Sequence, residues 1–365
     1  MKQRKTGKDD KPPSARGPWK IAIIANIKDE HQARPANVPI DAFADFDHIE
    51  TIDAIRNAIE TDNHKTIFIE ATSDLPNRLQ DEKPDICFNI AEGLGGDARE
   101  AQVPALLEML GIPYTGSRVM TNAIALDKTL TKRIWRDRNL PVAPFQEFSA
   151  PNEHLRQSLR FPLFVKPARE GTGMGVDMHA KVETEAELRE RVAYIVENYK
   201  QPALVESYLP GREFTIGQIG RPDAKEKSRH PEWYSPRGFH QFSILELESS
   251  RSATPGIYSN EAKSRSLGEE GAPQYLCPAN LNEELARKMK RLALRAHNLL
   301  GALDVSRVDV RLDAEGNPRL IEINPLPGLT PGYSDLCIQA AADGIAYEDL
   351  ILEILYLGAS RWNLY

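Results

Sequence analysis

Two short runs near the C-terminus, residues 306–311 and 320–325, constrain the fold of this chain more than any other feature. Both runs alternate apolar and polar residues, which is typical of half-buried β-strands. The segment Asp-Ala-Glu-Gly-Asn at 313–317 lies between them and is a turn signal. The pattern therefore predicts a β-hairpin.

The length of that turn decides which side chains of the hairpin face each other. With a two-residue loop at 315–316, Asp309 lies opposite Glu322 and Arg307 lies opposite Asn324. All four side chains then share one face, because side chains on a strand alternate between its two faces. A bulge in the loop would instead shift the pairing by one residue.

The predicted pairing of Asp309 with Glu322 implies a cation between them, because like charges directly opposite each other on neighbouring strands repel. Together with Asn324 they offer only oxygen ligands, which suits Mg²⁺ better than Zn²⁺. The alternative is a solvated strand face with scattered charges. The apolar run Asn-Pro-Leu-Pro-Gly-Leu-Thr at 324–330 is unusual for a surface hairpin and favours the metal site.

The composition excludes several classes of protein. The net charge of −7 argues against a nucleic-acid partner, and no apolar run approaches the roughly 20 residues of a membrane span. Residues 1–18 are basic and lack the apolar core of a secretory signal, so we expect a disordered lead-in. Cys87, Cys277 and Cys337 show neither metal spacing nor a disulfide framework, which favours a cytoplasmic location.

The 365 residues suffice for two or three compact units. Strands alternate with helical patterns over 19–120, which predicts a doubly wound domain with a parallel sheet. We expect an α+β unit over 121–211, opening with a helix at 122–138, and a second α+β unit over 212–365. The polar insert at 221–240 is expected to be a surface loop.

A candidate phosphate-binding loop begins at Lys166, in the run Lys-Pro-Ala-Arg-Glu-Gly-Thr-Gly-Met-Gly. Glycines 171, 173 and 175 let backbone N–H groups close around phosphate oxygens, and Lys166 adds a positive charge. The loop matches neither a Walker motif nor a Rossmann turn. Most glycine-rich loops are simply tight turns, so this segment alone is weak evidence.

Two further segments, taken alone, have common structural explanations that involve no ligand. Residues 204–213 place apolar side chains next to groups that suit adenine and ribose, but an ordinary strand–turn–strand has the same pattern. Lys128 lies on a predicted helix, where a lone lysine is usually a solvated surface charge.

Taken together, these segments resemble the ATP-grasp ligases, and most closely the branch of the D-alanine–D-alanine ligases. The matches span about residues 85–335 in the family's order. They are residues 111–117, 127–128, 161–175, 206–213, 261–263 with 277–279, 306–309, and 322–330. The resemblance implies an ATP-grasp fold, with an N-terminal doubly wound parallel-sheet domain, a central α+β domain and a C-terminal α+β domain. ATP would lie between the last two domains.

The resemblance also implies roles for individual residues in binding ATP. Lys128 and Lys166 would contact its phosphates and the adenine side, Glu206 the adenine edge, Glu213 the ribose, and Lys263, on a loop over the site, the γ-phosphate. The loop residues implied to hold the nucleotide are Gly171, Thr172, Gly173 and Gly175.

The same resemblance implies the catalytic groups. Asp309, Glu322 and Asn324 would hold two Mg²⁺ ions, which Mn²⁺ can replace. Arg307 and the backbone N–H of Gly328 would face the developing oxyanion, with Lys263 as the third catalytic residue.

The region for the first substrate departs from the D-alanine ligases. Residues 26–30 lack their glycine-rich turn, Thr172 stands where they place a serine, and Ser264 stands where they place a tyrosine. Glu92 is a candidate for binding an ammonium group and Arg99 for binding a carboxylate, and for both a helix-entry charge is an equal alternative.

Ser334 is the remaining candidate substrate residue. The serine expected after the Pro-Gly-x-Thr motif is displaced by one residue and becomes Ser334. It is an ordinary helix N-cap candidate, and it is also a candidate for binding the carboxylate of the second substrate.

The sequence thus predicts a cytoplasmic ATP-dependent carboxylate–amine ligase that forms an amide or dipeptide through an acyl phosphate. Its partners would be small-molecule amino acid or carboxylate and amine substrates, and a homodimer is an option because relatives often form one. The leading product is D-alanyl-D-alanine or a close dipeptide, as in cell-wall biogenesis. The alternatives are a specialised ligase of secondary metabolism and a nucleotide-binding protein without catalysis.

Overall fold

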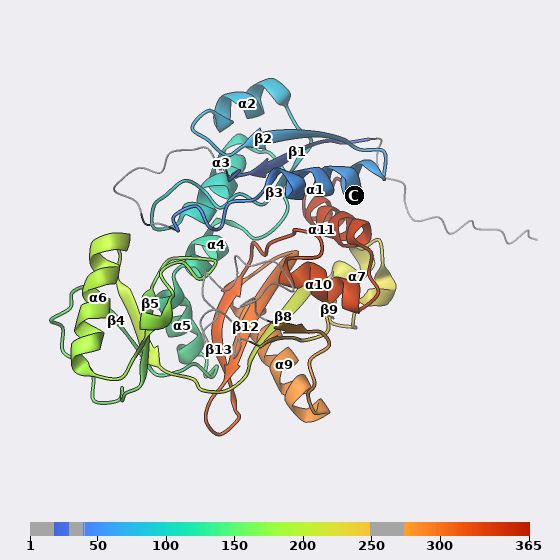
Figure 1. The fold of residues 1–365 in the computed structure, drawn as a ribbon. Helices are drawn as coiled ribbons and strands as arrows, with labels where there is room; N and C mark the ends of the chain where they lie inside the picture. The colour runs from blue at the N-terminus through green and yellow to red at the C-terminus, as the bar shows by residue number, and fades with distance from the viewer. Residues whose placement is uncertain (1–17, 29–38, 40, 249–273) are drawn as a thin grey trace, which may run out of the picture.

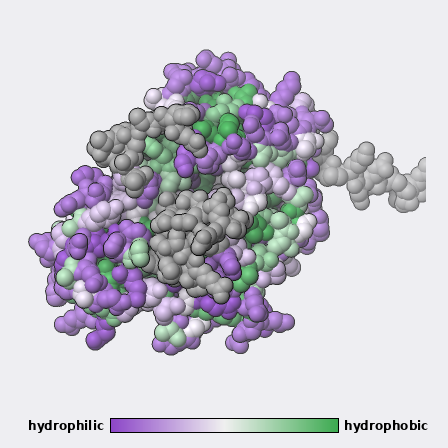
Figure 2. Space-filling model, in the orientation of Figure 1, coloured by the Kyte–Doolittle hydropathy of each residue, from purple (hydrophilic) through white to green (hydrophobic). Residues whose placement is uncertain are grey.

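The structure is a computed structural model that describes residues 18–28, 39, 41–248 and 274–365. Its strands form a parallel sheet and two antiparallel sheets, each packed against helices (Figure 1). The predicted lead-in at 1–18 lies outside the described residues except for Pro18. The face seen in Figure 2 is largely hydrophilic, with smaller hydrophobic areas. In the part of the chain that the structure describes, no helix has both the length and the apolar character needed to cross a bilayer.

The N-terminal sheet has three parallel strands in the order β2–β1–β3. Its strands are β1 (Lys20–Ala25), β2 (Lys65–Glu70) and β3 (Ile86–Asn89). Its helices are α1 (Ile49–Glu60), α2 (Leu75–Glu82) and α3 (Gln102–Leu110). Alternate residues of β1 face opposite layers, so that Ile23 packs with α1 and Ile24 packs with α2 and α3. This confirms the predicted doubly wound sheet.

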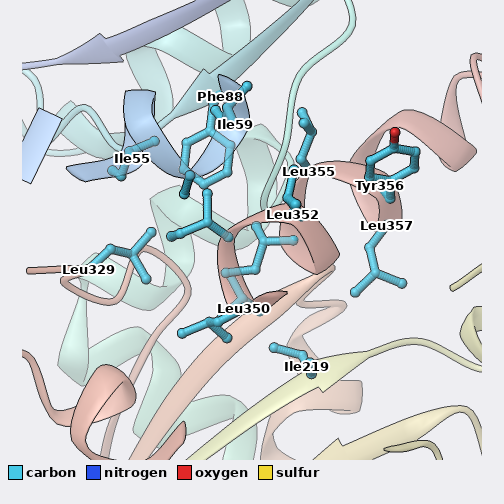
Figure 3. Close-up of a cluster of buried hydrophobic side chains, with 14 of the residues drawn as sticks. Ile55, Ile59, Phe88, Ile219, Leu329, Leu350, Leu352, Leu355, Tyr356 and Leu357 are labelled. Atoms are coloured by element: carbon cyan, nitrogen blue, oxygen red, sulfur yellow. The ribbon is translucent and has the colours of Figure 1, made fainter. Parts of the chain in front are cut away.

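The last helix, α11 (Tyr347–Arg361), packs under the N-terminal sheet although it ends the chain. Figure 3 shows Leu352 and Leu355 of α11 facing Ile55, Ile59 and Phe88. Residues 350–360 are buried all round the helix, as expected for a helix that packs between layers. The unit boundaries predicted at 18, 120 and 211 remain a prediction, and α11 adds to the core of the first unit.

The central sheet is antiparallel, in the order β4–β7–β5–β6. Its strands are β4 (Phe145–Phe148), β5 (Leu163–Pro167), β6 (Lys181–Val182) and β7 (Ala203–Ser207), and α6 (Glu185–Tyr199) packs on it. The sequence analysis predicted α+β structure in this region, and the sheet with its helix confirms it.

The single helix predicted over 122–138 is wrong, because the chain breaks at Asp127. Two helices, α4 (Val119–Leu126) and α5 (Lys128–Asp137), flank the break. The Asp127 carboxylate accepts a hydrogen bond from the N–H of Leu130 at 2.8 Å and so caps α5. The cap starts α5 at Lys128, whose backbone N–H donates to the carbonyl of Ala168 at 2.9 Å. Lys128 is thereby tied to the end of β5.

The C-terminal sheet is antiparallel, in the order β11–β10–β8–β12–β13, with β9 paired to β8. Its strands are β8 (Glu213–Gly220), β9 (Phe239–Gln241), β10 (Leu245–Glu248), β11 (Gln274–Leu276), β12 (Val305–Leu312) and β13 (Pro318–Asn324). Two helices, α9 (Glu283–Leu300) and α10 (Asp335–Ala342), pack on opposite faces of this sheet.

The hairpin β12–β13 has the predicted pairing but not the predicted loop. Near the turn Leu312 pairs with Pro318, and the turn comprises residues 314–316, one residue longer than expected. The register then shifts beyond Asp309, where Ile321 forms a bulge. The extra residue in the turn and the extra residue in the strand compensate each other. Asp309 therefore lies opposite Glu322, and Arg307 opposite Asn324, as predicted.

The insert at 221–240 has an exposed side, as predicted, but it is not a plain loop. It contains the short helix α7 (Ala224–Lys227) and a 3-10 turn, and it packs against α11. Arg221 donates to the carbonyl of Leu357 at 2.7 Å and to the hydroxyl of Ser360 at 2.8 Å. The insert thus has a buried side, which includes Arg221, and an exposed side, which includes Lys225, Glu226 and Arg237.

Candidate functional site

Two adjoining cavities lie on either side of the hairpin face. We call the first the glycine-loop cavity, because Lys166, Gly173, Glu206 and other residues of 164–176 and 206–213 line it. We call the second the acidic cavity, because most of the charged residues among its described lining are carboxylates. Their volumes are about 90 Å³ and 160 Å³. Among the described residues, Lys128, Glu170 and Glu322 line both cavities.

In the glycine-loop cavity a buried carboxylate joins two lysines. Glu206 lies 3.0 Å from the ammonium group of Lys132 and 3.1 Å from that of Lys166. Burial acts to raise the pKa of Glu206, but Lys132 and Lys166 outweigh it and hold that pKa below its usual value. Glu206 is therefore ionised at neutral pH, whereas burial lowers the pKa of Lys132.

Sequence reasoning missed Lys132, which is fully buried and donates to the carbonyl of Leu320 at 3.1 Å. In the sequence alone, Lys132 cannot be told apart from an exposed lysine on an amphipathic helix. The signal available was its spacing of four residues from Lys128, which puts both on one face of α5.

The remaining lining of the glycine-loop cavity fits a nucleotide. Apolar and aromatic side chains form its walls, including Phe164 on β5, Tyr208 just after β7 and Ile321 on β13. Glu213 and Arg311 also line it and form an ion pair at 3.0 Å. An apolar slot edged by a few polar groups is the usual form of a site for a flat heterocycle.

The predicted phosphate loop is split between the cavities. Gly171 and Thr172 line the acidic cavity and Gly173 lines the glycine-loop cavity. Thr172 and Gly173 both have positive φ values, 48° and 69°, so the backbone makes a left-handed turn here. The N–H of Gly175 donates to Asp41 at 2.8 Å, and a Cβ at this glycine would lie 2.5 Å from Pro167. Gly175 therefore supports the loop by close packing.

On the hairpin, Asp309 is buried and surrounded by donors. It accepts hydrogen bonds from Thr215, from Arg307 at 3.1 Å and from the amide of Asn324 at 3.1 Å. Glu322 lies 3.6 Å from the ammonium group of Lys128. Lysine and arginine thus offset the opposed carboxylates of the hairpin.

The hairpin side chains fit a magnesium ion by their chemistry. Two carboxylates and an amide offer oxygen donors at the junction of the cavities, which suits an ion that completes its shell with water and phosphate oxygens. No group of three His, Cys, Asp or Glu side chains in the described part of the chain is arranged to hold a metal. The three proposed ligands of the hairpin include only two carboxylates, Asp309 and Glu322, because the third ligand is the amide of Asn324, so they do not form such a group.

The acidic cavity contains the remaining candidates of the C-terminal unit. Arg307, Gly328 and Ser334 all line it. Ser334 lies at the N-cap position of α10 without capping it, and its hydroxyl instead accepts the N–H of Thr330 at 2.9 Å. Arg307 also pairs with Asp335, at the start of α10, at 2.8 Å.

Glu92 and Arg99 have different surroundings. Glu92 lines the acidic cavity, whereas Arg99 is not among the described residues that line either cavity. The guanidinium of Arg99 is held by Asp45 at 2.9 Å and Glu170 at 3.1 Å. Arg99 thus joins the N-terminal unit to the phosphate loop, and its role in binding a carboxylate stays a prediction. Lys263 and Ser264 lie outside the described residues.

Comparison with known proteins identifies similar chains. The family model described as "D-ala D-ala ligase C-terminus" matches residues 134–356. A D-alanine–D-alanine ligase from Pelotomaculum thermopropionicum is 31% identical over 87% of this chain and 93% of that protein. An uncharacterized protein, y4sG, from Sinorhizobium fredii is 30% identical over 85% of this chain and 88% of that protein.

A solved structure supports the fold. The crystal structure of D-alanine–D-alanine ligase from Bacillus anthracis complexed with ATP superimposes with a TM-score of 0.69. It covers 94% of this chain and 99% of that chain at 22% identity. At 22% sequence identity this similarity supports the fold, and it does not by itself establish the substrates or the roles of individual residues.

Proposed function

Because this chain belongs to the D-alanine–D-alanine ligase family, we propose that it is an ATP-dependent ligase that joins a carboxylate to an amine through an acyl phosphate. One observation carries the proposal more than any other. Lys128, Glu170 and Glu322 line both cavities, so a nucleotide in one cavity and a carboxylate in the other would meet at the metal-binding face of the hairpin.

The glycine-loop cavity is the proposed site of ATP. Its apolar walls would hold adenine, with Glu206 at the edge of the base and Glu213 at the ribose. Lys128 and Lys166, with the backbone of residues 171–173, would bind the phosphates. Gly175 would act only by supporting the turn.

Asp309, Glu322 and Asn324 would hold Mg²⁺, as two ions that Mn²⁺ can replace. Bound there, the metal would neutralise the phosphate charge that otherwise repels an incoming carboxylate. In the structure Lys128 pairs with Glu322 and Arg307 pairs with Asp309, and with a metal on these carboxylates both cations would be available to the reactants.

The reaction follows from the positions of these groups. An oxygen of the substrate carboxylate bonds to the γ-phosphorus while the bond to the bridging oxygen of ADP breaks. The neutral amine then bonds to the acyl carbon, and the tetrahedral oxyanion would face Arg307 and the N–H of Gly328. Phosphate leaves with the electron pair of the carbon–oxygen bond, and the amine loses a proton. Removing one oxyanion donor typically lowers kcat on the order of 10²–10³-fold.

Substrate identity is the finer part of the proposal. The resemblance favours D-alanyl-D-alanine or a close dipeptide, which would serve cell-wall biogenesis, and a specialised ligase with other substrates is the alternative. A protein that only binds a nucleotide does not need an oxyanion donor such as Arg307 beside the two proposed metal ligands, Asp309 and Glu322. The three free cysteines support a cytoplasmic location, and a homodimer remains an option.

The test is turnover followed by product identification. The protein is incubated with ATP, Mg²⁺ and pooled D- and L-amino acids, ADP formation is followed, and new amides are identified by mass spectrometry. We expect ADP and phosphate to form only when both a carboxylate and an amine are present. ATP binding without turnover on any pair would favour the non-catalytic alternative.

A further inference from the structure

A third cavity lies where the central sheet meets the hairpin. We call it the arginine cavity, because Arg136, Arg156 and Arg319 line it and no described lining residue carries a carboxylate. Its volume is about 510 Å³, and it shares no described lining residue with the other two cavities. The whole chain has a net charge of −7, so this cavity is a local excess of positive charge on an acidic protein.

The segment 139–145, which links α5 to β4, supplies most of the described lining of the arginine cavity. This segment is fixed against β13, because the N–H of Leu320 donates to the carbonyl of Pro141 at 2.9 Å and Val142 forms a β-bridge with Leu320. The cavity therefore has a backbone framework that belongs to both the central sheet and the hairpin.

The three arginines come from separate segments and are partly held in place. Arg136, on α5, lies over the ring of Phe145, with its guanidinium carbon 5.1 Å from the ring centroid. Asp313 holds Arg319 through Nε at 2.9 Å and through one terminal nitrogen at 2.8 Å. The backbone N–H of Arg156 donates to a buried side chain of β4 at 3.0 Å. Groups that are fixed before a ligand arrives lose less conformational entropy when they bind it.

Two of these guanidinium groups have no counter-charge among the described residues. The side chains of Arg136 and Arg156 form no ion pair or hydrogen bond with any described residue, and the carboxylate of Asp313 pairs with Arg319 alone. Both unpaired arginines are exposed, so water solvates them and the fold does not need a partner for either. The cavity thus offers two unmatched positive charges to a ligand.

A phosphate monoester suits this charge better than a carboxylate. It carries about −1.5 to −2 charges at neutral pH and three acceptor oxygens, whereas a single carboxylate would leave one guanidinium unmatched. The planar fork of a guanidinium fits phosphate oxygens, and the hydroxyl of Ser158 lines the same cavity as a further donor. Pro141, Val142 and Pro144 add apolar surface on which an organic group attached to the phosphate can pack.

We propose that the arginine cavity binds a small organic phosphate, at a site separate from the one proposed for ATP. The phosphate is bound by Arg136 and Arg156, and the organic group lies against the segment 139–145. A ligand held there bridges the central sheet and β13, the strand that carries Glu322 and Asn324. This site goes beyond the ligase reaction and does not depend on it.

The experiment uses glycerol 3-phosphate as the probe and glycerol as the matched compound without the phosphate. Binding is measured by isothermal titration calorimetry on the full chain at neutral pH. The chain is first saturated with Mg²⁺ and a non-hydrolysable ATP analogue, so that the probe does not enter the site proposed for ATP. Succinate, a small dianion without phosphorus, tests whether two negative charges alone are enough.

We expect glycerol 3-phosphate to bind and glycerol not to bind. Arg136→Gln and Arg156→Gln should each weaken that binding about tenfold, the size of one charge-assisted hydrogen bond. Arg156→Lys should lose less than Arg156→Gln, because lysine keeps the charge but not the planar fork. Arg237→Gln removes an exposed arginine that is not among the described lining residues and should leave the affinity unchanged. Thermal melts of each variant check that it is folded.

No binding of glycerol 3-phosphate, or binding that both glutamine variants leave unchanged, would overturn the proposal. Succinate that binds as tightly as glycerol 3-phosphate would overturn the assignment to a phosphate. None of these results bears on ligation, which ADP formation tests separately. A chain that proves not to be a ligase would likewise leave the phosphate site standing, so the failures of the two proposals are distinguishable.

Discussion

Asp309 and Glu322 face each other across β12 and β13 because a bulge at Ile321 offsets the extra residue in the hairpin turn. The bulge also brings Ile321 and Glu322, consecutive residues, to line the same cavity. Ile321 therefore adds an apolar wall where adenine is proposed to bind, and Glu322 adds a carboxylate where the metal is proposed to bind.

If this carboxylate pair holds Mg²⁺, then Asp309→Asn or Glu322→Gln should lower kcat more than about 100-fold, since even groups behind metal ligands are worth 10–100-fold. Phosphate release at saturating ATP and Mg²⁺ measures the effect, with Glu190→Gln, which changes an exposed carboxylate on α6, as the control. Activity close to that of the unmodified protein would contradict the role proposed for the hairpin.

Glu206→Gln should destabilise the fold by about 3–5 kcal/mol, because it leaves Lys132 and Lys166 buried without their counter-charge. Urea unfolding at pH 7 measures this. Glu147→Gln, on the neighbouring strand β4, removes an ion pair with a half-exposed arginine and should cost less than about 1 kcal/mol.

The pH dependence of that loss follows from the lowered pKa of Glu206. A carboxyl whose pKa is lower in the folded chain stabilises the fold above its unfolded pKa, and this stabilisation is lost as the pH falls. The difference between Glu206→Gln and the unmodified protein should therefore shrink on acidification below about pH 4.5. A difference that grows in acid would contradict the charged cluster.

Asp47→Asn should show the opposite pH dependence. The pKa of Asp47 is raised from 3.8 to about 7 by burial and by Asp45, so this group costs the fold stability progressively as the pH rises between these two values, and the loss is complete above about 7. The variant should be more stable than the unmodified protein at pH 8, by up to about 4 kcal/mol, and no more stable near pH 4. Thermal unfolding without ligands at both values measures the difference, and equal gains at both would refute this reading.

Tyr234→Phe should destabilise the protein by about 1–3 kcal/mol, because it removes a 2.6 Å hydrogen bond to the fully buried Glu353. This tests whether the 221–240 insert is part of the core. A free energy of unfolding within error of the unmodified protein would mean that the insert docks more loosely than its contacts with α11 indicate.

Lys263→Ala should lower kcat far more than nucleotide affinity, as the resemblance implies for a residue that closes over the site late. Lys263 lies outside the described residues, so kinetics and nucleotide binding must test it together. Equal losses in kcat and in ATP affinity would contradict a role in closure.

Much of the fold was predictable because its signals are local. The alternation of β12 and β13 and the positions of most helices follow from patterns of a few residues. The helix predicted over 122–138 failed because one capping carboxylate, Asp127, competes with helical continuity. The insert at 221–240 was only partly predicted, because two of its side chains, Arg221 and Tyr234, find buried partners on α11, more than 100 residues away.

The sequence by itself determined the alternation within each hairpin strand, since a period of two puts Arg307 with Asp309 on one face of β12 and Glu322 with Asn324 on one face of β13. The bulge at Ile321 decided that these two faces coincide. Only the tertiary structure decided which other residues line the acidic cavity together with the hairpin face. Asp47, Glu92 and Glu100 come from loops and a 3-10 turn of the N-terminal unit, and only the packing of that unit over the C-terminal sheet brings them beside Arg307 and Ser334. Strand periodicity is local, whereas the charge of a cavity is the sum of side chains that are remote in sequence.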